Sequence, residues 1–582
     1  MKATVASRLS STSSSSSSDQ NVATVNSRDK LRPGPEKMSS YDVVLKPNKD
    51  SLKRQILNSF KRKDQDIEDD NHSFSPLQMV LMPLGTCIGT GLFIGTAISL
   101  REGGPGGLLV SNLFMALLMV FVIPSLGEMS ATIPVTGSFT AYSAMFIHPS
   151  WGFAMGWIYA LNWLTVFPLE LTATSMAINY WQSNPIAPGY VLALLFVVII
   201  IVNLFGPQGY ATSESTASIV KVIGVMLFVI VGIMQNVGYL PRVNGEYIGG
   251  QYWRIPGPLA HGFKGVCSTL VHAAFAFSGT EMVGMYAAQA KNPAKSIPSS
   301  TKQVFWRIGL FYIAAVIIIG LDIPYNDPGL YDEHSSSPFV LAMMKTKLGA
   351  LPFIENLVIV LSILSVANCS VFAASTTIVG LSRKNLAPSL FGYVDRQGRP
   401  LPSLLLSLIF GTLAFIKLSS AGTQLFDWLL SLSGFGAILQ WASILFSHIR
   451  IRKALRREFP LDSLPYRALC GVWGSWAGLF MLGLAILAQF YTAFFPIQGS
   501  FTIEVFFQKI LALIVILLLF FSHVIFANRS SFVDGKRWRL IPTSSINMKE
   551  FVGNKVDCIK GDKNVSTEIV RGKAMRIVDF LC

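Results

Sequence analysis

Twelve stretches of mostly apolar residues recur between positions 77 and 527, with short polar segments between them. About 20 such residues form an α-helix long enough to cross the hydrocarbon core of a bilayer. The short alternating segments typical of membrane β-barrels are not the pattern here. The chain is therefore predicted to be an all-α polytopic membrane protein with 12 transmembrane helices, at about 77–100, 106–126, 152–181, 188–205, 217–236, 264–287, 305–324, 353–380, 402–418, 425–447, 471–494 and 504–527.

The first stretch contains an interruption at residues 82–95, which read MPLGTCIGTGLFIG. Each glycine costs a helix interior about 1 kcal/mol and a proline about 3 kcal/mol. Inside a bilayer, broken backbone is tolerated only where protein or a water-filled cavity satisfies the freed amides and carbonyls. Two interpretations follow: a half-helix N-terminus that holds an anionic group, or close helix packing through small residues.

A second interruption lies five spans later, at residues 271–281, which read VHAAFAFSGTE and place Glu281 within the membrane. Interrupted helices at corresponding positions of two halves are typical of a transporter binding site. Because each half has an odd number of spans, the second half should be inverted. We predict a 5+5 inverted repeat of the LeuT-like type with helices 1 and 6 broken, repeat one at 77–236, repeat two at 264–447, and helices 11–12 at 471–527.

The distribution of charged residues predicts the orientation of the protein in the membrane. Only 14% of residues are charged, against about 25% in soluble domains. Lysine and arginine concentrate in every second connection, which predicts cytoplasmic N- and C-termini. The same bias accounts for much of the formal charge of +15, so no nucleic-acid partner is expected. We predict a disordered cytoplasmic tail at 1–75 without a signal peptide, a transporter core at 76–528 and a cytoplasmic tail at 529–582.

The chemistry-bearing motifs of enzymes are missing from the chain. The six cysteines suggest no extracellular disulfide pair, and no cysteine–histidine cluster has zinc spacing. Walker A and dinucleotide-binding patterns are absent, as is an acyltransfer His-x-x-x-x-Asp pair. We therefore expect no enzymatic activity, no metal and no bound cofactor.

Several stretches carry a family resemblance, which extends over about residues 75–582. The sequence IGTGLFIG at 88–95 resembles the first-helix signature of the amino acid–polyamine–organocation superfamily. Further stretches resemble the fungal amino-acid permease branch of this superfamily: SLGEM (125–129), IPVTGSF (133–139), PLELT (168–172), KNP (291–293), FGYVDR (391–396), SHIR (447–450) and FLC (580–582). The resemblance implies a plasma-membrane symporter that imports amino acids by alternating access, with the proton as coupling ion.

Both tails carry candidate modification sites, the C-terminal one by resemblance and the N-terminal one by its residue types, with a plain solvated N-terminal tail as the alternative. The C-terminal FLC resembles a family ending that is a palmitoylation site, which makes Cys582 the expected lipidated residue. Lysines and serines of the N-terminal tail are candidates for regulatory modification, with ubiquitin-ligase machinery as the expected partner. Departures from the family pattern at Pro83, Thr86–Cys87 and Gln440 concern the identity of the substrate rather than the family.

An amino-acid substrate needs partners for its carboxylate and its ammonium group. Freed amides around the first interruption are the candidates for the carboxylate: Thr86, Cys87, Gly89, Thr90 and Gly91. By resemblance, carbonyls near Phe275, Ala276 and Ser278 would take the ammonium group. Phe275 or Phe277 would close over the ligand, unless these rings only pack against neighbouring helices.

Glu170, Lys221 and Glu281 are ionisable residues within predicted spans, where such groups usually face the interior or a cavity. Glu170 is interpreted as a substrate-binding or proton-coupling residue, or as a protonated acid hydrogen-bonded in the bundle. Lys221 either exchanges protons, as a lysine in this helix does in proton-coupled relatives, or extends to the cytoplasmic interface. In related transporters an acid at the position of Glu281 takes part in proton-linked release.

By resemblance to the family, the tenth span should flank the pocket for the substrate side chain. Its Ser433 and Gln440 are the candidates for specificity, with ordinary helix packing as the alternative. The sequence does not identify the amino acid that is carried. A transporter-like sensor that binds amino acids with little or no transport is the other functional hypothesis.

Overall fold

The computed structural model describes residues 59, 61, 74–135, 137–181, 188–240, 247–287, 290, 293–331, 337–418, 422–461, 464–497, 499–527, 539–546 and 548. The predicted tails fall almost wholly outside this part of the chain, and so does Cys582. Two described positions of the predicted N-terminal tail contact a later turn. Arg399 donates to Ser59 Oγ over 3.2 Å, and the Arg396 amide donates to the carbonyl of Lys61 over 3.0 Å.

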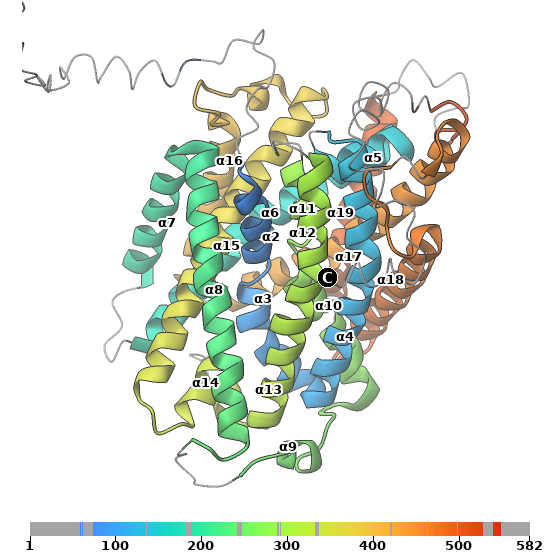
Figure 1. Ribbon diagram of the computed structural model, residues 1–582. Helices are drawn as coiled ribbons and strands as arrows, with labels where there is room; N and C mark the ends of the chain where they lie inside the picture. The colour runs from blue at the N-terminus through green and yellow to red at the C-terminus, as the bar shows by residue number, and fades with distance from the viewer. Residues whose placement is uncertain are drawn as a thin grey trace, which may run out of the picture. The chain divides into compact units, whose positions relative to one another are not determined.

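The described residues form long, tightly packed helices (Figure 1). The first predicted half contains α2 (Pro76–Thr86), α3 (Thr90–Phe93), α4 (Gly95–Thr132), α5 (Ser138–Phe146), α6 (Pro149–Ile178), α7 (Pro188–Leu204) and α8 (Gly206–Asn236). It is followed by α9 (Gln251–Arg254), α10 (Gly262–Phe277), α11 (Met282–Ala287), α12 (Pro293–Arg307), α13 (Ala314–Asp322), α14 (Pro338–Met344), α15 (Ala350–Arg383), α16 (Leu401–Gly411), α17 (Gly422–Glu458), α18 (Gly471–Phe494) and α19 (Ile503–Ala527).

Helix lengths and hydropathy agree with a polytopic membrane protein. Within the described ranges, seven helices are long and apolar enough to cross a membrane, and four shorter apolar helices accompany them. The count of twelve spans and the inverted repeat stay predictions. The structure adds elements that hydropathy did not predict, among them α5, α9 and α14, which are too short to span a bilayer.

Local chemistry explains where the first span starts and stops. Ser75 and Gln78 form a capping box, in which each side chain accepts a hydrogen bond from the amide of the other residue, at 3.3 and 2.9 Å. The helix ends at Thr86, and Gly89 then adopts an extended backbone before α3 begins. Further along, Gly104 has a φ of 71°, which separates two helical stretches within α4.

The broken helices lie inside the bundle. Helix α2 packs on α8, while α10 contacts α3, α4 and α17, and α6 packs along α15. Polar side chains that would be costly next to lipid are buried between these helices, among them Glu170, Lys221 and Glu281. The interior therefore combines a continuous apolar core with a small number of enclosed polar groups.

Candidate functional site

Both interruptions occur where the sequence predicts them, and they face each other across the interior. The first separates α2 from α3 at residues 87–89, and the second separates α10 from α11 at residues 278–281. The hydroxyl of Thr86 donates to the carbonyl of Gly279 over 3.3 Å. A side-chain carbon added at Gly91 would lie 2.5 Å from Cα of Ala276, so only glycine permits this approach.

Glu170 reaches the first interruption from α6. Its Oε2 accepts a hydrogen bond of 2.5 Å from the hydroxyl of Thr90, at the first residue of α3. The carboxyl group is 1% exposed, so this contact lies in the interior rather than in a solvent cleft. The structure thus brings together two of the predicted site residues that are far apart in the sequence.

Lys221 reaches the same interruption from α8, on the other side. Its ammonium group donates to the carbonyl of Gly85 over 2.6 Å and lies 3.4 Å from Oε1 of Glu214. The second carboxylate oxygen of Glu214 accepts a hydrogen bond of 2.5 Å from the hydroxyl of Ser365 on α15. Lys221 is 1% exposed, so in this conformation it does not extend to the membrane interface.

A tyrosine that sequence reasoning missed connects the two interruptions. The Tyr312 hydroxyl lies 2.7 Å from the carbonyl oxygen of Cys87 and 2.8 Å from that of Ala276. A phenol has one hydrogen to donate, so it can bond to only one of these carbonyls at a time. The carbonyl of Ala276, predicted to take the substrate ammonium group, therefore competes with Cys87 for this hydroxyl.

The second interruption is closed by its own acid. Both carboxylate oxygens of Glu281 accept from the amide of Gly279, at 3.2 and 3.1 Å. The indole of Trp441 on α17 donates to the same carboxylate over 3.3 Å. Glu281 therefore stabilises the turn that leads from α10 into α11.

The two candidate aromatic rings have different surroundings. Phe277 is fully buried and packs on Tyr312, with ring centroids 4.7 Å apart. Phe275 lies on the side of α17, where a carbon added at Gly434 would be 3.5 Å from Cβ of Phe275. In this conformation Phe275 is therefore the better candidate for the ring that closes over a ligand.

Several buried polar atoms near these helices have no hydrogen-bond partner. They are both amide atoms of Asn162, Nε1 of Trp163, Oγ of Ser433 and both amide atoms of Gln440. A carbon added at Gly436 on α17 would lie 4.0 Å from Oδ1 of Asn162 on α6, and a carbon added at Gly279 would lie 3.6 Å from the Trp163 ring. Buried polar groups normally have partners, so these atoms are candidates for contacts with a bound polar molecule.

The amides predicted to bind the substrate carboxylate differ in whether they already bond within the protein. The amide of Cys87 bonds to the carbonyl of Gly85 as the last turn of α2. Gly89 is the N-cap residue of α3, and Gly91 is the second residue of that helix, so both lie where the interruption ends and a new helix begins. Of the residues missed, Glu214 had a readable signal, since it lies seven positions before Lys221 and so on the same face of a helix.

Comparison with known proteins gives one family. A family model described as amino acid permease matches residues 78–532. The general amino-acid permease GAP1 of Saccharomyces cerevisiae is 39% identical over 488 residues, which are 82% of this chain and 79% of that protein. The amino-acid permease inda1 of Hypocrea atroviridis is 43% identical over 75% of this chain and 78% of its own length. The general amino-acid permease GAP2 of Candida albicans is 41% identical over 77% of this chain and 76% of its own length.

Proposed function

Because the chain belongs to the amino acid permease family, we propose that it is a secondary active transporter that imports amino acids together with protons. The family indicates amino-acid transport across a membrane. The coupling ion, the alternating-access cycle, the plasma-membrane location and the cytoplasmic termini are parts of the proposal. It is supported most by one observation: two interrupted helices meet in the interior, and an acid and a cation from two further helices bond to the first of them.

In this proposal the interruptions recognise the groups common to all amino acids. The N-terminal turn of α3, from Gly89 to Gly91, offers amides to the substrate carboxylate. Carbonyls around residues 275–278 accept from the ammonium group, and the Tyr312 hydroxyl moves to the carbonyl of Cys87 when Ala276 is engaged. Recognition of the common groups thus fixes the class of substrate.

The unpartnered polar atoms of α6 and α17 are proposed to select among amino acids. Asn162, Ser433 and Gln440 present hydroxyl and amide groups without partners. A site that hydrogen-bonds a polar substrate rejects an apolar analogue strongly, because its own buried groups are then left unpaired. We therefore expect a preference for amino acids with polar side chains over aliphatic ones of the same size.

Proton coupling is assigned to three residues. Lys221 holds the last turn of α2 through the carbonyl of Gly85, so loss of its proton would weaken the contact between α8 and the first interruption. Glu170 contacts the start of α3 through Thr90. Proton transfer to Glu281 would weaken its bonds to the amide of Gly279 and thereby loosen the second interruption.

Uptake into proteoliposomes tests the proposal directly. Radiolabelled amino acids should accumulate when an inward proton gradient is imposed, and a sodium gradient alone should have no effect. A requirement for sodium would show that the coupling assignment is wrong. Specific binding without accumulation under any gradient would instead favour the amino-acid sensor. A competition panel of all amino acids in the same assay would identify the substrate.

A further inference from the structure

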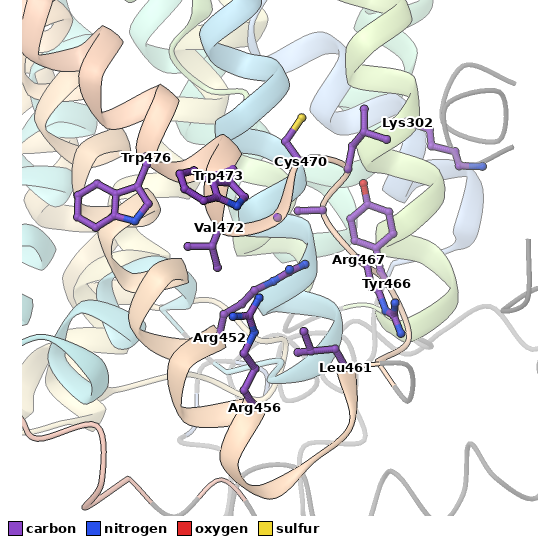
Figure 2. A pocket seen from close by; sticks show the side chains of 13 residues that line it. Lys302, Arg452, Arg456, Leu461, Tyr466, Arg467, Cys470, Val472, Trp473 and Trp476 are labelled. Carbon is purple, nitrogen blue, oxygen red and sulfur yellow. The ribbon is translucent and has the colours of Figure 1, made fainter. Parts of the chain in front are cut away.

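A pocket lies away from the helix interruptions, at the connection between α17 and α18. Its volume is about 590 Å³. Figure 2 shows the side chains that line it, which come from α17, the connecting segment, the start of α18 and, through Lys302, from α12. Among the described residues that line it are four cations and two tryptophans but no aspartate or glutamate: Lys302, Arg452, Arg456, Arg467, Trp473 and Trp476.

One of these cations is already neutralised. Arg452 pairs with Glu128 of α4 through Nε over 2.6 Å, and the amide of Ala468 donates to the same carboxylate over 2.7 Å. A buried pair of this kind fixes the connecting segment against α4. Arg456 lies one turn further along α17 on the same face, lines the pocket and is exposed, so its guanidinium is accessible to an anion in the pocket.

The backbone of the pocket also favours an anion. Helix α18 starts at Gly471 without a side-chain cap, and Val472 and Trp473 of its first turn line the pocket. The N-terminus of a 24-residue helix carries unpaired amides and a partial positive charge. Gly471 has a φ of 55°, which favours glycine, and an added side-chain carbon would lie 2.7 Å from a nitrogen of Arg452 and displace that guanidinium.

An apolar strip continues from the pocket along α18. Trp473 is 84% exposed, and Trp476, Phe480, Leu484 and Leu487 are exposed at intervals of three or four residues, on one face of the helix. In a membrane-spanning helix this face is available to acyl chains, and tryptophans at its end are typical of the membrane interface. The cationic pocket and the apolar strip are thus continuous, as the headgroup and the chains of a phospholipid are.

We propose that this pocket binds the phosphorylated headgroup of an anionic phospholipid, whose acyl chains lie along the exposed face of α18. The charge bias of the connections places this end of the protein in the cytoplasm, where anionic lipids concentrate. The headgroup bridges α12 with the α17–α18 connection through Lys302, Arg456 and the first turn of α18. A free phosphate satisfies the charges but leaves the apolar strip without a role.

Native mass spectrometry of the full chain in detergent tests the proposal. Phosphatidylinositol 4-phosphate is titrated, with phosphatidylcholine as the neutral lipid. The first equivalent of the anionic lipid should remain bound, and Arg456→Gln should weaken it about fivefold, with a further fivefold for Lys302→Gln, as expected for single cations near an anionic group. The matched control is Arg457→Gln, the next residue on α17, which is exposed but does not line the pocket.

Two further arms identify the occupant. Inositol 1,4-bisphosphate should compete only weakly, and Trp473→Ala should weaken binding of the lipid without changing binding of this soluble headgroup. Equal losses in Arg456→Gln and Arg457→Gln, or equal retention of phosphatidylcholine, would overturn the proposal. Complete displacement of the lipid by inorganic phosphate would overturn it in favour of a soluble anion. Thermal unfolding of each variant separates loss of binding from loss of fold.

Discussion

The two helix interruptions differ in what holds them. The first, at residues 87–89, is held by side chains from other helices: Glu170 from α6 and Lys221 from α8. The second, at residues 278–281, is closed by its own Glu281, with Trp441 as the added partner. The first interruption therefore depends on an acid and a cation from separate helices, whereas the second combines its own acid with uncharged contacts from Thr86 and Trp441.

Because different groups hold the two helix interruptions, we expect the interruptions to have different roles in transport. A break that is bonded to an acid and a cation on separate helices changes when either group moves or exchanges a proton. A break capped from within keeps its shape until its own acid is changed. We infer that coupling is centred on the first interruption and that the second mainly provides a hinge. Four substitutions test this contrast.

The largest effect is expected from Lys221→Met. The substitution leaves Glu214 buried beside Ser365 without its cation, and loss of one partner of a buried pair costs about 3–5 kcal/mol. Thermal stability in detergent should fall sharply. The double variant Lys221→Met/Glu214→Gln should recover most of the stability but none of the uptake driven by a proton gradient.

Its matched control is Lys347→Met, because Lys347 is exposed in the connection between α14 and α15. This variant should leave both stability and uptake unchanged. Gradient-driven uptake by the double variant at the original rate would show that Lys221 has only a structural role.

Glu170→Gln should have the next largest effect. The amide oxygen of glutamine still accepts from Thr90, so the fold should persist, while the ability to carry a charge is lost. Because glutamine cannot take up or release a proton, we expect uptake driven by a proton gradient to fall by about tenfold or more, which corresponds to about 1.4 kcal/mol, at normal surface expression. Thr90→Ser, which keeps the hydroxyl, should remain active. Unchanged kinetics of Glu170→Gln would make this residue structural.

Gly91→Ala tests whether the two interruptions must touch. The added carbon would meet the backbone of Ala276 at 2.5 Å, and overpacking of this kind costs about 1–3 kcal/mol. Uptake and thermal stability should both decrease. Gly95→Ala is the control, because its nearest neighbour would be 3.8 Å away and alanine favours the helix. Equal behaviour of the two variants would contradict a functional contact at Gly91.

The smallest effect is expected from Glu281→Gln. One amide oxygen can still accept from Gly279, so the loss of stability should be about 1 kcal/mol. Uptake should persist, with a weaker dependence on external pH, because the side chain no longer takes a proton. If this variant lost gradient-driven uptake as completely as Lys221→Met/Glu214→Gln, the contrast between the two interruptions would be wrong.

Part of this site could be predicted from the sequence for simple physical reasons. Glycines within an apolar segment and charges within the membrane are costly, so Thr90, Glu170, Lys221 and Glu281 were recognisable without a structure. Tyr312 and Trp441 were not, since an aromatic residue in an apolar span looks like any core residue. Only their hydrogen bonds to Cys87, Ala276 and Glu281 distinguish them.

Packing between helices also decided which predicted residues meet. The helical period shows which positions share a face of one helix but not which other helix that face contacts. Thus the sequence identified Phe275 and Phe277 as equal candidates, and the contact of Phe277 with Tyr312 separated them. The same holds for Ser433 and Gln440, because only the structure shows that their buried polar atoms have no hydrogen-bond partner.

The sequence by itself determined the class of the protein, its membrane-spanning character and the two positions where its helices break. Hydropathy and helix propensity act locally, so they can be read from a single chain. The tertiary structure decided that the breaks face each other, that one is bonded to an acid and a cation from other helices while the other keeps its acid within the turn, and that arginines and tryptophans gather in the pocket between α17 and α18. Most of these features arise from contacts between residues that are 80 to 324 positions apart in the sequence, and no local pattern specifies such contacts.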